Sequence, residues 1–213
     1  YSMPWLNQVS ALTHCWYLGS ESGTALANVL SGKVCPRGKL PITFAEKYED
    51  YPYVKYGPEA YPGVNKQVPY KEDIFVGYRH FATNNVTPRF PFGFGLSYTT
   101  FSCSKPVAAK SGNEVTITVT VSNTGAVAGK EVMQVYAQSP KGELPRPIKE
   151  LKGFAKTKLL QPGESQTLSI TIPVEELRHF NDSQHDWTLI SGDYTFHVGT
   201  SVNDIFGKAT VNL

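Results

Sequence analysis

The chain has 213 residues, of which 20 are basic and 18 acidic, so that its formal net charge is +2. Apolar residues make up 40% and charged residues 18%, with 18 glycines and 15 prolines, which is typical of a turn-rich globular protein and excludes a disordered or fibrous one. No apolar run approaches the roughly 18 residues of a membrane span, and no basic stripe typical of nucleic-acid binders is present. We therefore expect neither a membrane nor a nucleic acid as a partner.

The N-terminal residues and the cysteines lead to two further expectations. The chain opens Tyr1-Ser2-Met3 without a basic region and an apolar stretch, so we expect no signal peptide there. Its cysteine count is odd, and no C-x-x-C motif supports a zinc or thioredoxin-type site. The odd count leaves open a free thiol or a partner cysteine outside this sequence, and it fixes no pairing among Cys15, Cys35 and Cys103.

The first 44 residues show the pattern of an α/β layer. A first helix is predicted by apolar residues at helical spacing, namely Leu6, Val9, Leu12 and Trp16. A second helix is predicted over residues 21–31, with Ser20 or Ser22 as its N-cap and Gly32 after its last turn. A short strand is predicted over residues 40–44. A unit of this size is too small to bury a core alone, so it requires neighbours.

The next stretch is irregular and rich in tyrosine and proline. Residues 48–70 contain six tyrosines and four prolines, and proline denies the chain helical and central-strand hydrogen bonds. Tyrosine packs its ring while its hydroxyl stays hydrated, which suits a connector laid over another domain. The main interpretation is a packed linker, and the alternative is an aromatic platform for sugar.

The last stretch is all-β in pattern. Residues 115–121 alternate strictly between branched apolar residues and threonine, and further strands are predicted over residues 132–136, 168–172, 187–190 and 194–198. Residues 174–178 are predicted to form one helical turn. Short strands with turns at this spacing favour a two-sheet sandwich of the immunoglobulin or fibronectin type III kind.

We therefore predict a mainly β fold, an immunoglobulin-like (fibronectin type III-like) β-sandwich preceded by a partial α/β sandwich remnant and a long irregular linker. The predicted parts are residues 1–44 for the remnant of the α/β sandwich domain, residues 45–104 for the linker and residues 105–213 for the fibronectin type III-like domain.

Motifs for nucleophilic, cofactor or metal chemistry are incomplete. Residues 95–99 resemble G-x-S-x-G around Ser97 but lack the last glycine, and Gly93 and Gly95 are not followed by the third glycine of a dinucleotide loop. His179 and His185, with Asp182 and Asp186 nearby, are candidate metal ligands. The interpretation that we favour is a polar surface loop. We expect no cofactor and no metal site.

Carboxylate pairs matter because sugar hydrolysis uses two of them. Glu72 and Asp73 are adjacent, and on a strand such neighbours point to opposite faces. Glu49 with Asp50 and Glu175 with Glu176 are interpreted as solvated charges or caps. We expect no catalytic residue in this chain. Arg79 is predicted to pair with Glu72 or Asp73.

Several strings together carry a family resemblance. The end of the α/β sandwich domain of glycoside hydrolase family 3 resembles residues 3–6, 16–27 and 32–44. The linker of that family resembles residues 70–81 and 90–101, and its C-terminal fibronectin type III-like domain resembles residues 121–125, 129–132, 146–154, 160–164 and 192–194. The likeness is greatest to the β-glucosidases.

The resemblance implies a C-terminal part of a retaining β-glucosidase that removes terminal non-reducing β-D-glucosyl residues. It places the nucleophilic Asp on an N-terminal barrel and the acid/base Glu on the sandwich domain, both upstream of this chain, so that the missing N-terminal domains are the expected partner and the β-glucoside substrate is met through them. This chain alone is expected to be inactive and to brace those domains. Alternatives are a parent with β-xylosidase specificity and a module that binds polysaccharide or lignin.

Two sequons are candidates for glycosylation, at Asn85 and Asn181. Together with the resemblance they predict a secreted glycoprotein that acts in cellulose degradation. Phe90–Phe101, which has four phenylalanines and a tyrosine around two glycines, is predicted to be a wedge between domains.

Overall fold

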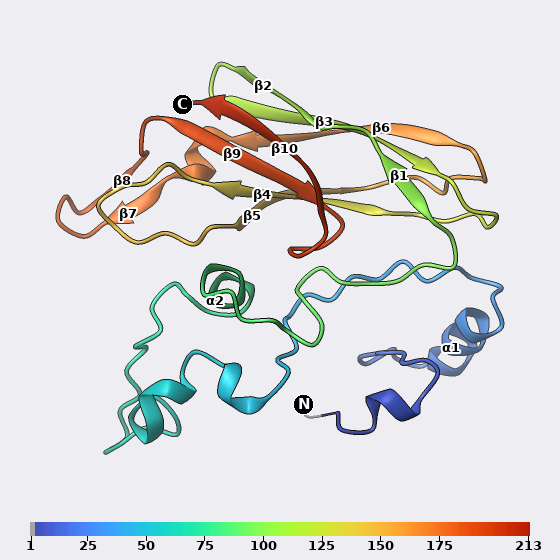
Figure 1. Ribbon diagram of the computed structural model, residues 1–213, viewed down its shortest axis with the longest axis horizontal. Coiled ribbons are helices and arrows are strands. Elements are labelled where there is room, and N and C mark those ends of the chain that lie inside the picture. Colours follow the sequence, from blue (N-terminus) through green and yellow to red (C-terminus); the bar gives the residue numbers. More distant parts are fainter. Residues whose placement is uncertain (1–2) are drawn as a thin grey trace.

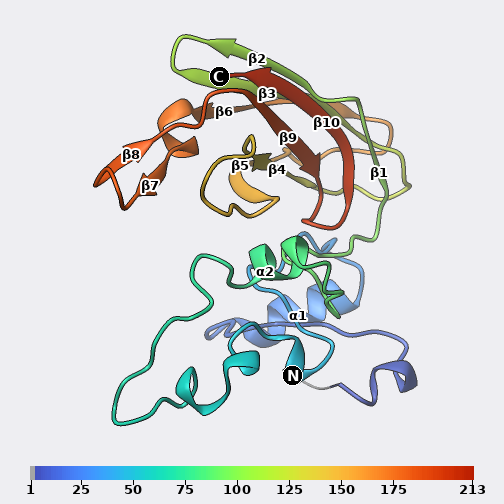
Figure 2. The same cartoon turned by 60° about the vertical axis from the view of Figure 1, so that its left-hand side comes forward.

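A two-sheet sandwich formed by residues 101–213 lies over the first hundred residues, which are mostly irregular (Figure 1). The computed structural model describes residues 3–213. A view turned by 60° shows the same two layers, with α2 (Tyr78–Thr83) directly beneath the sandwich and α1 (Ser22–Leu30) below it (Figure 2). The fold class predicted from the sequence is confirmed.

The first sheet is built around β3 (Glu114–Asn123). β6 (Ser165–Pro173) pairs with β3 along almost its whole length, and β1 (Phe101–Cys103) and β2 (Val107–Ser111) follow one another along its other edge. All of these pairings are antiparallel, and the short turn between β2 and β3 is a connection that antiparallel strands allow.

The second sheet has the order β10-β9-β4-β5, again antiparallel throughout. Its strands are β4 (Val132–Gln138), β5 (Glu150–Lys156), β9 (Asp193–Gly199) and β10 (Ile205–Asn212). A separate hairpin of β7 (His179–Asn181) and β8 (Asp186–Thr188) projects beside the sandwich (Figure 1). The predicted strand at residues 187–190 therefore exists only in part, and it pairs outside the two sheets.

The core lies between the sheets and follows the alternation seen in the sequence. β3 buries one face and leaves its threonines at the surface, and β4, β6 and β9 face it with further apolar side chains. The buried side chains of β3 are Val115, Ile117, Val119 and Val121. Burial of each such side chain contributes about 1.5–3 kcal/mol, so these strands hold the sandwich together.

The first hundred residues contain only short helices. Besides α1 and α2, they form 3-10 helices at Leu6–Gln8, Tyr48–Asp50 and Val54–Glu59. The fourth 3-10 helix, Val174–Leu177, confirms the helical turn predicted between two strands of the sandwich.

The predicted first helix is wrong. Only Leu6–Gln8 is helical, Val9 is extended, and Trp16 has a positive φ of 46°. Val9, Leu12 and Trp16 are each more than 40% exposed. A helix of this length is stabilised mainly by packing of its apolar face, and that face has no partner among residues 3–213.

The second helix is confirmed, with a different cap. α1 begins at Ser22 and ends at Leu30, and Gly32 follows at a φ of +75°, the left-handed conformation that glycine favours after a helix. Its N-cap residue is Glu21, without a side-chain capping bond, so the predicted caps Ser20 and Ser22 are wrong.

In place of the predicted strand over residues 40–44, separate backbone hydrogen bonds join this segment to residues 90–94. The Leu40 and Phe44 amides donate to the Phe94 and Phe90 carbonyls at 2.8 and 2.9 Å. Only the Phe44–Phe90 bridge is regular, so no full strand forms. This pairing places residues 89–94 between the first segment and the sandwich. The domain limits at residues 44 and 104 stay predictions.

Candidate functional site

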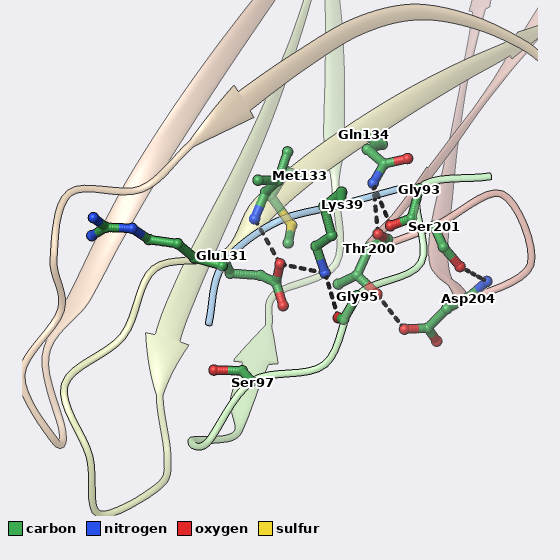
Figure 3. A network of polar contacts seen from close by, with 12 residues as sticks. Lys39, Gly93, Gly95, Ser97, Glu131, Met133, Gln134, Thr200, Ser201 and Asp204 are labelled. Carbon is green, nitrogen blue, oxygen red and sulfur yellow. Dashed lines mark hydrogen bonds and ion pairs between the residues drawn. The ribbon is translucent and has the colours of Figure 1, made fainter. Parts of the chain in front are cut away.

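The junction between the segment of residues 33–98 and the sandwich is the part of the molecule where separate elements meet through polar side chains. Figure 3 shows its central network, in which Lys39 lies between Glu131 and Gly95. Ion pairs, hydrogen bonds and ring contacts across the junction hold the two parts of the chain together.

Lys39 forms the central ion pair. Its Nζ lies 2.8 Å from Glu131 Oε1 and donates to the Gly95 carbonyl at 3.1 Å (Figure 3). The two side chains are only 14% and 10% exposed. Glu131 is fixed further because its carboxylate accepts the Val132 amide at 2.7 Å, and its own amide donates to Thr157 Oγ1 at 3.0 Å. The pair thus joins three segments at one point.

Gln134 makes the second link. Its Nε2 donates to the Thr200 carbonyl at 2.6 Å and to the Gly93 carbonyl at 3.2 Å, and its Oε1 accepts the hydroxyl of Tyr136 (Figure 3). Gly93 has a φ of +81°, and a Cβ there would lie 2.2 Å from Gln134 Oε1. The close approach predicted for this glycine is therefore confirmed.

An aromatic contact lies beside these links. The Tyr78 ring packs on Phe92 at 4.7 Å and against Tyr136 at 5.9 Å, and the Tyr78 hydroxyl accepts the Leu151 amide at 2.9 Å. Burial, with Tyr78 nearby, raises the pKa of Tyr136 far above its ordinary value, so this phenol stays neutral. The Val202 amide also donates to the Phe92 carbonyl at 3.1 Å. The predicted wedge therefore contacts the sandwich through Phe92.

Arg79 contacts the sandwich rather than its own linker. Its guanidinium lies 4.0 Å from Glu150, whose other oxygen pairs with Arg146 at 2.7 Å. The predicted partners Glu72 and Asp73 are therefore wrong. They lie on a turn rather than a strand, and α2 points Arg79 toward β5.

The other carboxylate pairs lie apart from this junction. Asp50 accepts the Lys47 amide at 3.1 Å, which makes it a cap, while Glu49 is exposed. Glu175 and Glu176 stand exposed in the first turn of their 3-10 helix. Ser97 Oγ lies 3.1 Å from Cys35 Sγ and accepts the Thr99 amide at 3.3 Å. These contacts give it a structural role.

The histidines weighed as metal ligands have other neighbours. His179 Nε2 lies 3.3 Å from Thr188 Oγ1, and the His185 ring contacts Phe180 at 5.8 Å. Among residues 3–213, no group of three or more His, Cys, Asp and Glu side chains is arranged to hold a metal ion. Burial lowers the pKa of His179, which keeps this imidazole neutral.

All three cysteines carry free thiols. Cys103 lies 3.7 Å from Met133 Sδ, and burial raises the pKa of its thiol to about 11. A thiol with that pKa is protonated at neutral pH and behaves as a small apolar side chain.

The sequons differ in their accessibility. Asn85 is exposed just after α2, as is Thr87. Asn181 is half-buried at the end of β7, and its Oδ1 accepts the Ser183 and Gln184 amides at 3.0 and 3.3 Å. No helix of the described residues is long and apolar enough to cross a membrane.

The tyrosine-rich segment packs around Tyr53. Its ring stacks on Tyr51 at 5.9 Å and contacts Tyr48 and Tyr61 at 6.0 and 5.9 Å. Tyr51 in turn contacts the buried Phe81 of α2 at 6.2 Å. This arrangement ties the loop to α2 while Tyr48 and Tyr61 stay exposed.

The remaining surface of the first segment is unusually apolar. Eight large apolar side chains between residues 5 and 34 are exposed, and Tyr17 is fully so. We call this set the apolar strip: Trp5, Val9, Leu12, Trp16, Tyr17, Leu18, Leu30 and Val34. Large apolar side chains exposed in such number along one stretch of the chain favour a contact site. The sequence had already indicated such a surface, because the first 44 residues are too few to bury a core alone and therefore need neighbours.

Two models of known protein families match this chain. A model of the glycosyl hydrolase family 3 C-terminal domain matches residues 1–98, and one of the fibronectin type III-like domain matches residues 131–202. The chain belongs to glycoside hydrolase family 3. The two matched parts are those joined by the Lys39 and Gln134 contacts, so the junction is the contact between the family's C-terminal domain and its fibronectin type III-like domain.

Curated relatives match the chain over almost its whole length. The chain is 44% identical over 212 residues to beta-glucosidase BoGH3A of Bacteroides ovatus, with 98% of the chain and 28% of the relative covered. It is 43% identical to beta-glucosidase B of Emericella nidulans, with 100% and 26% covered. The chain thus spans about a quarter of the length of these relatives.

Solved beta-glucosidase structures agree with the fold. The chain matches DesR, a beta-glucosidase from Streptomyces venezuelae in complex with D-glucose, with a TM-score of 0.95 and 38% identity over 99% of the chain and 27% of DesR. It matches the beta-glucosidase of Kluyveromyces marxianus with a TM-score of 0.93 and 39% identity over 100% of the chain and 26% of that protein.

Proposed function

We propose that this chain is the C-terminal portion of a retaining β-glucosidase that removes terminal non-reducing β-D-glucosyl residues. Retaining hydrolysis requires two carboxyl groups about 5–5.5 Å apart, one as nucleophile and one as acid/base. The buried carboxylates of the junction, Glu131 and Glu150, are both held in ion pairs with basic side chains. The catalytic pair is therefore assigned to the part of the protein outside these residues.

The role of this chain in that enzyme is to brace the catalytic domains. The observation that carries this role is the apolar strip, which is exposed although its side chains are of the kind that domains bury. The sandwich fixes the segment that follows the strip, because Lys39 and Tyr78 contact it and Gln134 of β4 binds the Gly93 carbonyl. The partner of the strip is the catalytic part of the same protein.

A comparison of two substrates tests the activity. The full-length enzyme is expected to hydrolyse p-nitrophenyl β-D-glucoside with a higher kcat/KM than p-nitrophenyl β-D-xyloside. A higher kcat/KM for the xyloside would replace the proposal by its β-xylosidase alternative. Failure to hydrolyse either substrate would discard the glycosidase activity altogether.

We also propose that the enzyme is secreted, carries N-linked sugar at Asn85 and acts on cello-oligosaccharides. The exposed position of Asn85 and Thr87 supports the modification site, whereas the side-chain oxygen of Asn181 is engaged in its own turn. Protein from the native host is expected to lose mass on treatment with an endoglycosidase, and an Asn85→Gln variant to lose none. Equal mass loss in both would move the site elsewhere.

A further inference from the structure

We propose that a pocket between the tyrosine-rich loop and α2 binds a neutral sugar ring. The pocket has a volume of about 230 Å³ and is lined by residues of the 3-10 helix Val54–Glu59, the turn at residues 71–75, and α2 with its C-cap Asn84. Pockets for drug-sized ligands begin near 300 Å³, so this one suits a smaller molecule such as a monosaccharide.

The walls offer the two kinds of surface that a sugar presents. Tyr56 and Phe75 supply aromatic rings, which contact the apolar C–H faces of a pyranose. Glu72, Asp73 and Lys55 supply charged groups, which hydrogen-bond to hydroxyls more strongly than neutral groups do. Rings and charged groups together in one pocket fit a polyhydroxylated ligand better than a purely apolar one.

The acceptor groups of the pocket are free to bind. The Glu72 and Asp73 carboxylates form no hydrogen bond or ion pair within the described residues, although Glu72 is half-buried. Lys55 has only a cation–π contact with the Tyr56 ring, at 4.8 Å. Lys71 differs from Lys55, because its ammonium is already paired with Glu59.

The floor of the pocket is pre-organised. His80 Nε2 donates to the Asp50 carbonyl at 3.2 Å, and Asn84 Nδ2 donates to His80 Nδ1 at 3.0 Å and to the His80 carbonyl at 3.1 Å. These bonds leave the Asn84 Oδ1 as an additional acceptor at the pocket. A fixed floor lowers the ordering cost of binding.

The charge of the pocket selects among ligands. Lys55 and Lys71 equal Glu72 and Asp73 in number, so the lining residues carry no formal net charge, and Lys71 is paired with Glu59 outside the lining. An anion would meet two carboxylates, and a metal ion would meet two ammonium groups. A neutral ligand with many hydroxyls meets donors and acceptors without either repulsion, so we assign the pocket to a neutral pyranose.

The test is titration of the isotope-labelled 213-residue chain with β-D-glucose, cellobiose and D-xylose, followed by the backbone amide signals of Thr83 and Asn84. For a ligand of this size we expect saturable shifts with a Kd on the order of 1 mM. Glu72→Gln keeps the shape of the pocket but removes a charged acceptor, and should raise Kd at least about fivefold. Tyr56→Ala should abolish saturation because it removes one wall.

Matched controls come from the same segment. Glu49→Gln and Tyr70→Ala change exposed residues that do not line the pocket, and both should bind sugar as the unchanged chain does. Absence of saturable shifts at sugar concentrations far above the millimolar range would overturn the proposal. So would an unchanged Kd in a folded Glu72→Gln variant. Since the chain alone is titrated, neither result depends on whether the full-length enzyme hydrolyses glucosides.

Discussion

Single residues at the junction carry uneven shares of its stability. Lys39→Ala would leave the Glu131 carboxylate nearly buried without its partner, and removal of one member of such a pair costs about 3 kcal/mol. Lys158→Ala breaks a pair with Glu164 whose lysine is 59% exposed, and should cost less than about 1 kcal/mol. Urea unfolding of both variants measures the difference. Equal costs would show that the Lys39 pair does not brace the junction.

Stability should also fall in mild acid because of buried histidines. Burial lowers the pKa of His197 to about 4, with the positive charges of Lys149 and Lys208 adding to the effect, and its only polar contact is Gln138 at 2.9 Å from Nε2. The unfolded chain therefore binds a proton first as the pH falls. The stabilisation is complete above about pH 6.5 and is lost as the pH falls toward 4, up to about 3 kcal/mol.

The measurement is the free energy of unfolding as a function of pH. His197→Gln should flatten the curve between about pH 6.5 and 4. An identical acid loss in the His197 variant would assign the effect to other groups, such as His80 and His179, whose pKa values burial also lowers.

At the residue scale, sequence reasoning found types of group but not their partners. It identified the glycines around Phe94 as sites of close approach, which Gly93 against Gln134 confirms. It paired Arg79 with its sequence neighbours, because nothing in one sequence reports that α2 faces Glu150. Lys39 and Glu131, 92 positions apart, gave no signal at all, since long-range pairing depends on the whole fold.

At the element scale, the segment of residues 90–94 should tolerate no side chain at Gly93. Gly93→Ala combines a φ of +81° with a Cβ 2.2 Å from Gln134, so it should cost about 2–4 kcal/mol. Gly112→Ala has a similar strain, with a φ of +55°, but open space around its Cβ, and should cost about 1–2 kcal/mol. Thermal unfolding of both compares them. A Gly93 variant no worse than the Gly112 variant would contradict the tight contact.

Elements were predictable where local pattern and burial agree. The strict alternation over residues 115–121 is confirmed by β3, and Gly32 ends α1 as predicted. The first helix failed because helical spacing alone does not form a helix whose apolar face is exposed. The short β8 pairs with β7 rather than with a sheet, and a single sequence does not report strand partners.

For the whole molecule, the apolar strip predicts a difference between this chain and the full-length protein. Leu30→Lys changes a side chain that is 64% exposed, so in this chain the free energy of unfolding should change by less than about 0.5 kcal/mol. In the full-length enzyme the same change would bury a charge against the catalytic domains and should destabilise it by about 3 kcal/mol or more.

Val107→Lys is the matched control, because Val107 is also 64% exposed but lies on β2 of the sandwich, away from the strip. It should change stability by less than about 0.5 kcal/mol in both proteins. A Leu30 variant that is equally silent in the full-length enzyme would mean that nothing covers this part of the strip.

The architecture of the whole molecule was predictable. For the site, the sequence predicted only that no catalytic residue lies in this chain. Motif order and strand spacing indicated the sandwich, the linker and the partial α/β layer, and the exposed strip agrees with a segment that needs neighbours. An aromatic platform for sugar in the tyrosine-rich stretch was the alternative interpretation from the sequence, but the sequence alone did not indicate that Tyr56 and Glu72 line one pocket.

The most direct measurement is hydrolysis of p-nitrophenyl β-D-glucoside by three preparations: this chain, the complementary N-terminal part of the enzyme, and their equimolar mixture. We expect no turnover by this chain, and restored turnover in the mixture that Leu30→Lys weakens and Val107→Lys does not. Turnover by the homogeneous chain alone would contradict the assignment of both catalytic carboxylates to the rest of the protein.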